Sequence, residues 1–292
     1  MPVIGITLGD AAGLGPEIVA AALRSGKLDP GFEYRVIGET GDATPGEPTP
    51  ASARAARAAL EESARRALAG EIAAVVTGPI HKARMQAEGF AFPGQTEFFA
   101  ERAGVRNFAM CLTGGALTVA LVTAHVPLRA VAENLRSSEI IRVGQLLAAF
   151  LTARLGRAPR IAVAGLNPHA GESGALGREE IEIIAPAIIL LTHHPSPLAP
   201  ASFTGPLSPD TVFHRAVAGE FDGVLCMYHD QGLIPLKLHA FDSGVNVTLG
   251  LPFPRTSPDH GTAFEIAGKN LARPDSMIAA LRLAAELARS RS

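Results

Sequence analysis

Residues 222–232 read DGVLCMYHDQG, a short apolar run followed by a tyrosine, a histidine and an aspartate. A short apolar run next to turn residues is typical of a buried strand. Gly, Asn, Asp or Pro alone can make the turn that ends a strand. A histidine next to an aspartate is therefore not needed to end the strand. We interpret His229 and Asp230 as a functional pair.

Strands and helices are expected to alternate along the whole chain. Apolar runs predict strands at 2–8, 33–38, 73–77, 107–113, 117–123, 160–166, 222–228 and 245–249. The segments between them predict helices at 16–25, 52–69, 96–103, 138–155, 177–192, 209–219, 262–268 and 275–290. Such alternation favours an α/β fold with a largely parallel sheet. The segments 40–50 and 193–209 are rich in Gly and Pro, which predicts surface loops.

The composition is that of a globular protein. The chain has 292 residues, of which 47% are hydrophobic and 18% charged, and this suits one large or two medium domains. A net charge of −2 without a basic block argues against nucleic-acid and anionic-membrane partners. No apolar stretch reaches the ~18–20 residues of a membrane span, and we expect no signal peptide. Cys111 and Cys226 lie in apolar runs, which predicts buried thiols in a reducing cytoplasm rather than a disulfide.

Three histidines each follow a predicted strand. His125 comes after 117–123, His169 after 160–166 and His229 after 222–228, and nearby prolines or glycines favour loops at these positions. Ligands of open α/β sheets bind beyond the carboxyl ends of the strands. Three imidazoles that converge there can hold Zn²⁺ or a similar cation and leave positions open for substrate. The alternative is three unrelated loop histidines.

Groups suited to an anion follow His229. Lys237, Asn246 and Arg255 provide a point charge, an amide and a planar fork, which together can hold a phosphate or carboxylate. Solvated surface charge is the alternative. The turn GDAAGLGPE at 9–17 leads into a helix whose first turn can receive an anion, or it is simply a tight connection. G-x-G-x-x-G does not occur, so the pattern gives no direct indication of a dinucleotide.

Several ordered motifs resemble the 4-hydroxythreonine-4-phosphate dehydrogenase family of pyridoxal 5′-phosphate biosynthesis. They are GDAAGLGPE, TGPIHK, PGQTEFFAE, TAHVPLR, GLNPHAGE, GPLSPDT, MYHDQGLIPLK and GVNVTLGLPFPRTSPDHGTAFEIAG. The resemblance implies a two-domain α/β/α fold like that of isocitrate and isopropylmalate dehydrogenases. It also implies a cytoplasmic homodimer whose active sites lie between the domains at the dimer interface. By analogy we place 1–105 with 253–292 in the first domain, and 106–252, with the histidines and dimer contacts, in the second.

The same resemblance implies roles for particular residues. One divalent cation (Zn, Mg or Co) would be bound by histidines drawn from both subunits, matching His125, His169 and His229. Catalytic aspartates would match Asp210 and Asp230. Substrate-binding positions would match Thr96, Lys237, Asn246 and Arg255. Gln95 stands where the family commonly has a substrate-contacting histidine, and it can donate a hydrogen bond but cannot become cationic.

The implied reaction is oxidation of 4-phosphohydroxy-L-threonine with NAD or NADP. Its product, 2-amino-3-oxo-4-phosphooxybutanoate, would decarboxylate to 3-amino-2-oxopropyl phosphate. Gln95 keeps open a sister dehydrogenase of another phosphorylated or cyclic hydroxy acid. The missing dinucleotide fingerprint keeps open a metal-dependent hydrolase and a non-catalytic metal- or phosphate-binding protein.

Overall fold

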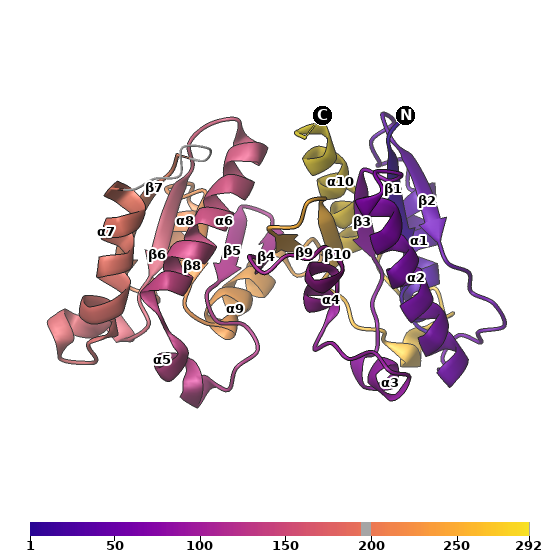
Figure 1. Cartoon of the computed structure of the whole chain (residues 1–292), viewed down its shortest axis with the longest axis horizontal. Coiled ribbons are helices and arrows are strands. Elements are labelled where there is room, and N and C mark those ends of the chain that lie inside the picture. Colours follow the sequence, from indigo (N-terminus) through magenta and orange to yellow (C-terminus); the bar gives the residue numbers. More distant parts are fainter. Residues whose placement is uncertain (194–199, 292) are drawn as a thin grey trace. The chain divides into compact units, whose positions relative to one another are not determined.

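The computed structural model describes residues 1–193 and 200–291, which form two compact units (Figure 1). Unit 1 comprises Met1–Arg106 and Asp242–Ser292, and unit 2 comprises Asn107–Phe241. We expected the chain to return to the first domain at residue 253. It returns at Asp242, because strand β9 (Val245–Leu249) pairs with β10 (Arg255–Pro258) of unit 1.

Unit 1 is built on a mixed sheet. Its strands lie in the order β2 (Glu33–Ile37), β1 (Val3–Thr7), β3 (Ala74–Thr77), β10 and β9. All neighbours are parallel except β9 and β10. Strand β3 is buried along its whole length and β1 is buried from Ile4 to Thr7, as expected of central parallel strands, which are mainly apolar rather than alternating.

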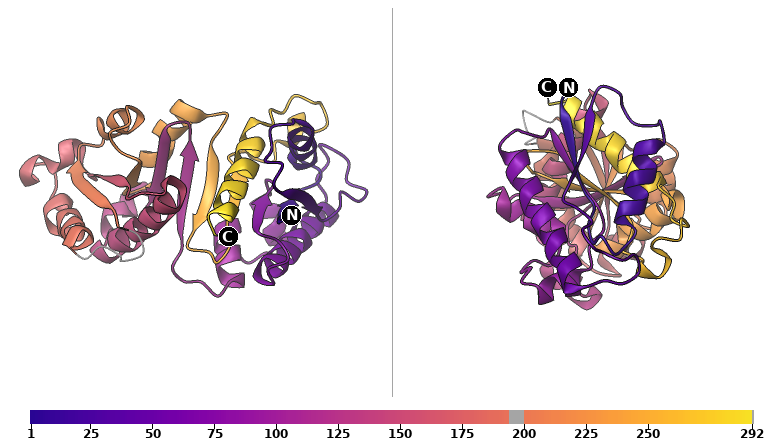
Figure 2. Two further views of the ribbon diagram at one scale, coloured as in Figure 1. Left: turned by 90° about the horizontal axis from the view of Figure 1, so that it is seen from above. Right: turned by 90° about the vertical axis from the view of Figure 1, so that its right-hand side faces the viewer.

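Helices cover both faces of this sheet. They are α1 (Gly15–Arg24), α2 (Pro50–Leu68), α3 (Lys82–Ala87), α4 (Gln95–Arg102) and α10 (Asp275–Arg289). In the right-hand view of Figure 2, α2 lies on one side of the strands and α1 with α10 on the other. The apolar stripe of α10 packs against β3 and β10.

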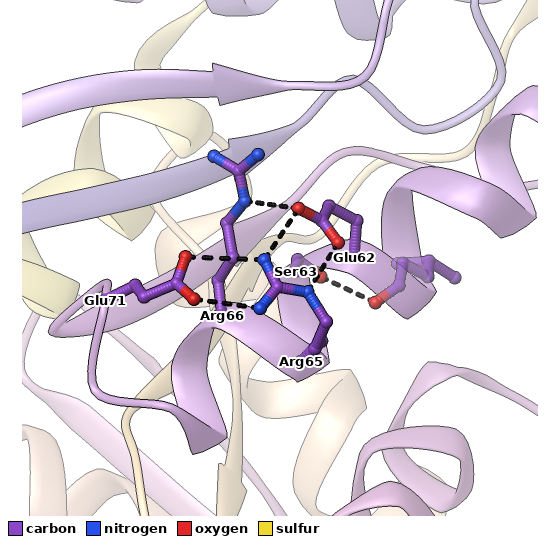
Figure 3. Close-up of polar contacts among 6 residues, drawn as sticks. Glu62, Ser63, Arg65, Arg66 and Glu71 are labelled. Carbon is purple, nitrogen blue, oxygen red and sulfur yellow. Dashed lines mark hydrogen bonds and ion pairs between the residues drawn. The ribbon is translucent and has the colours of Figure 1, made fainter.

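Helix α2 shows how local sequence sets an element of unit 1. Thr49 and Ser52 form a reciprocal capping box at its start, which satisfies backbone N–H groups that have no partner within the helix. At its other end Arg65 donates hydrogen bonds to Glu62 and Glu71, both at 2.8 Å (Figure 3). These charges lie on the solvent face, while the buried face of α2 includes Ala53, Ala56, Ala59, Ala64 and Ala67.

Unit 2 also has a mixed sheet. Its strands lie in the order β4 (Ala109–Gly114), β5 (Leu117–Leu121), β8 (Gly223–Cys226), β6 (Arg160–Ala164) and β7 (Ser202–Leu207). The β4–β5 pair is an antiparallel hairpin, and the other pairs are parallel. Parallel strands direct their carboxyl ends to one edge, so β5, β8, β6 and β7 all end there.

The helices of unit 2 pack on both faces of its sheet (Figure 1). They are α5 (Val131–Asn134), α6 (Ser137–Leu155), α7 (Ala185–His193), α8 (Val212–Val217) and α9 (His229–Ala240). Short 3₁₀ segments span Leu128–Ala130 and Pro168–Gly174, and a π-helical turn, Glu180–Ile184, precedes α7. Leu233 and Leu236 of α9 reach the same buried cluster as Val119 of β5.

The predicted α/β class is confirmed, but several predicted elements are wrong. Residues 202–207 lie in the predicted loop 193–209 but form an edge strand, the place in a sheet where a proline such as Pro206 is tolerated. Residues 194–199 of that predicted loop lie outside the described part. The predicted helix 262–268 is only a short 3₁₀ turn, Phe264–Ile266. Helix α9 was not predicted, and it contains Pro235, a residue that disfavours a helix interior.

Both cysteines are confirmed as buried free thiols. Burial raises the pKa of Cys111 to about 12 and also raises that of Cys226, so neither is a reactive thiolate at neutral pH. A bilayer-spanning helix has to be long and apolar, and none within residues 1–193 and 200–291 meets that requirement.

Candidate active site

Four neighbouring strands of unit 2 each lead into one of the residues singled out from the sequence. In the sheet order β5, β8, β6, β7 these residues are His125, His229, His169 and Asp210. Because the four strands are parallel, their carboxyl ends lie along one edge of the sheet. The structure therefore gathers the predicted catalytic and metal-binding residues of unit 2 on a single edge.

His125 and His229 are close together at this edge. Their ring centroids are 5.8 Å apart and their planes are tilted by 42°. Nδ1 of His229 contacts Oδ1 of Asp230 at 2.7 Å. A carboxylate on one ring nitrogen fixes the tautomer and orientation of an imidazole and leaves the other nitrogen to act as a ligand.

His229 begins helix α9, which corrects the loop that we expected at this position. Tyr228 before it is extended, and Asp230 lies in the first helical turn, where the helix dipole favours a negative charge. A Cβ on Gly232 would lie 3.0 Å from Sγ of Cys226, so the glycine lets α9 pack closely on the strands. Lys237 lies further along the same helix.

His169 lies in a left-handed turn after β6. All residues from His169 to Ser173 have φ between 43° and 81°. This region costs a residue other than glycine about 1–2 kcal/mol. Nδ1 of His169 contacts Oε1 of Glu172 at 2.6 Å, and this hydrogen bond raises the pKa of the imidazole. Backbone strain of this kind is characteristic of functional sites, where the surroundings hold it in place.

The buried carboxylate of Glu180 holds the start of this turn. Its Oε1 accepts hydrogen bonds from the backbone N–H groups of Leu166 at 2.7 Å and Asn167 at 2.8 Å. Its Oε2 accepts another from the Asn167 side chain at 2.9 Å. A Cβ on Gly171 would lie 2.7 Å from this Oε2, so only glycine fits there. Glu180 thus offsets part of the strain.

Asp210 is exposed on the loop after β7. Ser208 donates a hydrogen bond to it at 2.5 Å, which lowers the pKa of the carboxyl, and the His169 charge lowers it further. The carboxylate is therefore ionised at neutral pH and suited to accept a proton or orient a charged group.

The donor chemistry of this edge fits a divalent cation. His229 and His169 each carry a carboxylate on Nδ1, the arrangement that orients metal-binding imidazoles. In the described part of this single chain, however, no three His, Cys, Asp or Glu side chains form a group that could hold a metal ion. His125 and His229 are neighbours, and His169 does not complete a set with them, so the three-histidine ligand set stays a prediction.

Unit 1 contains a second cluster, around Arg255. The residue is only 3% exposed, and burial lowers the pKa of its guanidinium to about 10. Its Nη2 donates to Thr77 Oγ1 at 2.6 Å and to Gln95 Oε1 at 2.9 Å, and its Nη1 donates to Thr248 Oγ1 at 3.3 Å. Arg255 is the first residue of strand β10.

Two of the remaining predicted substrate positions, Gln95 and Thr96, lie at this cluster, and Asn246 lies on β9 opposite Ser257. Thr96 Oγ1 is 3.4 Å from Thr248 Oγ1, and Gln95 donates to the Gly78 carbonyl at 3.1 Å. Asn246 Oδ1 and Arg255 Nε are buried and have no hydrogen-bond partner within the described residues. Buried polar atoms that lack a partner are costly, and an anionic ligand would satisfy Nε.

The glycine-rich turn at 9–17 is explained by close packing. Cβ atoms on Gly9 and Gly15 would lie 2.1 Å from the Pro79 carbonyl oxygen and 1.6 Å from that of Leu8. Asp10 is buried, and its Oδ1 accepts a hydrogen bond from the Ala12 N–H at 3.1 Å. The tight connection thus accounts for these glycines without a bound anion.

Several residues that support the two clusters were not predicted. Thr77 and Thr248 hold Arg255, Glu172 contacts His169, and Glu180 holds the left-handed turn. Thr77 stands in the quoted TGPIHK motif, and Glu172 in GLNPHAGE, so the motifs contained part of the signal. Glu180 and Thr248 act through the fold, and no local pattern marks them.

Comparisons with known proteins identify the family of the chain. Residues 19–284 match the family model described as pyridoxal phosphate biosynthetic protein PdxA. A 4-hydroxythreonine-4-phosphate dehydrogenase from Caulobacter vibrioides is 43% identical over 332 residues, covering 99% of this chain and 98% of that protein.

Solved structures show the same relationship. The crystal structure of 4-hydroxythreonine-4-phosphate dehydrogenase from Klebsiella pneumoniae has a TM-score of 0.83 and 35% identity, covering 99% of this chain and 100% of that one. A terephthalate 1,2-cis-dihydrodiol dehydrogenase from Burkholderia xenovorans has a TM-score of 0.69 and 27% identity, with 98% of both chains covered.

The fold likeness extends further than the sequence likeness. An isocitrate dehydrogenase from Methylococcus capsulatus aligns with a TM-score of 0.51 at 17% identity, over 99% of this chain and 88% of that one. The relationship that we inferred to isocitrate dehydrogenases is therefore confirmed at the level of the fold. With these matches along nearly its whole length, the chain belongs to the 4-hydroxythreonine-4-phosphate dehydrogenase family, PdxA.

Proposed function

We propose that this protein oxidises 4-phosphohydroxy-L-threonine with NAD⁺ or NADP⁺ in the pathway to pyridoxal phosphate. The C3 hydroxyl loses its proton to the protein and C3 loses a hydride to the nicotinamide, which leaves a ketone. The product is a β-keto acid, so it loses CO₂ and gives 3-amino-2-oxopropyl phosphate. The buried thiols favour the cytoplasm as the place of this reaction.

The proposal assigns a role to the predicted residues of each unit. In unit 1, Arg255 with Thr96 and Asn246 would bind the phosphate, and by the family resemblance Lys237 of unit 2 would also bind substrate. Asp210 or Asp230 would accept the hydroxyl proton, directly or through a relay. His125, His169 and His229 would hold a divalent cation, which when bound supplies Lewis acidity toward the hydroxyl.

One observation carries this assignment. Arg255 is a buried guanidinium whose hydrogen bonds to Thr248, Thr77 and Gln95 go to neutral groups, and the Glu97 carboxylate raises its pKa by less than burial lowers it. Removing a guanidinium charge from water is costly, and an anion that binds next to it offsets part of that cost. A dianionic phosphate that accepts from a planar fork meets this requirement.

We also propose that the protein works as a homodimer and that its cation is shared between subunits. Ile234 and Leu238 of α9, and Phe241 just after it, are exposed, and Leu238 is 89% exposed. Large exposed apolar side chains on one helix face favour a protein interface. A ligand set drawn from two copies would also account for the incomplete histidine set of one chain.

The test is the appearance of reduced nicotinamide with 4-phosphohydroxy-L-threonine and either NAD⁺ or NADP⁺. The protein is assayed as purified, after removal of metal by a chelator, and after reloading with Zn²⁺, Mg²⁺ or Co²⁺. We expect activity to disappear on stripping and to return on reloading. Full activity in the stripped protein would contradict the metal role, and phosphate release without nicotinamide would favour a hydrolase.

A sister dehydrogenase is the second candidate, and Gln95 is the observation that favours it. Its amide oxygen accepts from Arg255, its amide nitrogen donates to the Gly78 carbonyl, and it brings no positive charge. A less positive pocket suits a carboxylate better than a dianionic phosphate. The similar structure from Burkholderia xenovorans is named for a substrate that carries carboxylates. Assaying a cyclic dihydrodiol carboxylate beside the phosphate substrate separates the two.

A further inference from the structure

Gln231 belongs to the quoted MYHDQG motif but has no place in the proposed chemistry. Its side chain is buried, at 7% exposure, and both ends of its amide are used. Oε1 accepts a hydrogen bond from the backbone N–H of Met227 at 2.6 Å, and Nε2 donates one to the carbonyl of Gly165 at 2.7 Å. Met227 follows β8, and Gly165 follows β6.

This amide lies where the pairing of β6 and β8 has ended. The two strands pair through Val163 and Leu225, and continuing that register places Gly165 opposite Met227. Gln231 therefore joins two strand ends through a side chain instead of a direct backbone contact. A buried amide with both ends satisfied is a rigid connection, because losing either partner leaves a polar group buried and unpaired.

The connection continues to the other strands that carry site residues. The Met227 carbonyl accepts hydrogen bonds from the Thr123 backbone N–H at 3.1 Å and the Thr123 hydroxyl at 2.7 Å. The Gly165 N–H donates to the Leu207 carbonyl at 2.8 Å. Thr123 leads to His125, and Leu207 leads to Asp210. One network thus runs across the ends of β5, β8, β6 and β7.

We propose that Gln231 is a positioning residue that fixes the spacing between the strand ends bearing His125 and His229 and the one bearing His169. The inference rests on the metal role proposed above for these histidines. Residues that orient metal ligands typically change metal affinity by about 10–100-fold when they are replaced. Gln231 would act in this way on three ligands at once without touching the cation.

The test measures Co²⁺ binding directly, using chelator competition and the visible d–d absorption of the cobalt-loaded full-length protein. Gln231→Met removes both hydrogen bonds at similar volume. Gln231→Glu keeps an acceptor for the Met227 N–H but cannot donate to Gly165. We expect both variants to bind Co²⁺ about 10–100-fold more weakly, with a shifted d–d band.

Thr113→Val is the matched control. It removes a buried hydroxyl of the same unit, which pairs with Thr118 at 2.8 Å, in the hairpin that precedes the site edge. We expect wild-type cobalt affinity and spectrum from it. Urea unfolding of each metal-free variant separates loss of stability from loss of positioning, and Gln231→Glu serves if Gln231→Met does not fold.

His169→Ala separates this inference from the proposed function. If His169→Ala loses Co²⁺ while both Gln231 variants bind it with the wild-type affinity and spectrum, the positioning role is wrong and the metal role stands. If His169→Ala binds Co²⁺ like the wild type, the metal role fails, and the inference that rests on it fails too. Weakened binding in the Gln231 variants with an unchanged Thr113→Val supports the proposal.

Discussion

The Arg255 cluster of unit 1 and the strand-end loops of unit 2 are built in opposite ways. Arg255 lies on a strand and is almost completely buried. His169 is exposed, and its loop has a left-handed backbone. In the first region a buried guanidinium is held in place by the residues packed around it. In the second, an exposed imidazole is carried by a strained backbone. The difference suggests a division of work, in which one region recognises an anion and the other does chemistry.

The largest effect should come from the accessible region. His169→Ala removes one of the three proposed metal ligands, and metal assistance is worth several kcal/mol, so we expect kcat to fall about 1,000-fold or more. Circular dichroism and the urea midpoint should stay near wild type because the side chain is exposed. His214→Ala, an exposed histidine on α8 of the same unit, is the control and should retain full activity. An active, metal-replete His169→Ala would contradict the assignment.

Removing the buried charge should affect binding more than turnover. Arg255→Met keeps the stem and removes the guanidinium, and losing one partner of a buried charge pair costs about 2–5 kcal/mol. We expect kcat/KM for the phosphorylated substrate to fall by roughly 100- to 1,000-fold, mainly through KM. Arg54→Met, at an exposed arginine that pairs with Glu88, should leave the kinetics unchanged. Equal losses in the two variants would mean that burial gives Arg255 no special role.

The amino-terminal ends of the strands of unit 2 sharpen the comparison, because there an aspartate and two arginines form ion pairs and no strained turn is involved. Asp222, just before β8, accepts from Arg157 Nη2 at 2.7 Å and from the backbone N–H of Arg160 at 2.7 Å. The Arg157 hydrogen bond lowers the pKa of this carboxyl well below its usual range. We expect Asp222→Asn to lower the free energy of unfolding by about 1–3 kcal/mol at pH 7.

The sign of the pH dependence follows from that lowered pKa. A carboxyl whose pKa is lower in the folded protein stabilises it above the unfolded pKa, near 4, and loses this contribution as pH falls toward the folded pKa. The gap between wild type and Asp222→Asn should therefore narrow as pH is lowered from 6 toward 3. Urea unfolding at several pH values measures this difference in unfolding free energy. A difference that grows on acidification would contradict the stabilising role of the Asp222 carboxylate. Glu71→Gln, in the exposed network of Figure 3, should show no measurable change.

The smallest effect probes the strain itself. Ala170 has φ of 53°, and glycine adopts this conformation without the steric cost that alanine meets. We expect Ala170→Gly to stabilise the protein by up to about 1 kcal/mol, the strain relieved minus the entropy that glycine loses. Ala55→Gly, at an exposed position within α2, should destabilise it by about 1 kcal/mol. The same sign in both variants would show that the turn is not strained.

The sequence predicted the strand ends well because apolar runs mark buried parallel strands directly. His125, His169 and His229 stand beyond three such runs, and the structure places them beyond β5, β6 and β8. The order of those strands in the sheet depends on long-range packing, which no local pattern contains. That order is what brings His125 and His229 together and leaves His169 one strand further along.

The features that the sequence missed are those that break local rules. Pro235 argues against a helix over 229–240, yet the packing of Leu233 and Leu236 stabilises α9. Gly171 is the only glycine among the five left-handed residues 169–173, and Ala170 and Glu172 disfavour that conformation, so the local sequence did not predict the turn. Arg255 was predicted to bind an anion, but its place on a strand and its threonine partners required the fold.

The discontinuous unit 1 has a consequence for how the molecule is made. Strand β3 leaves the ribosome long before β10, its neighbour in the sheet, because all of unit 2 is translated between them. At about 5–20 residues per second, that stretch takes on the order of ten seconds to synthesise. Unit 2, which is continuous from Asn107 to Phe241, is complete before β9, β10 and α10 emerge. Unit 1 is thus the first unit to begin synthesis and the last to be completed. Until β10 is translated, the edge of β3 that pairs with it stays unpaired.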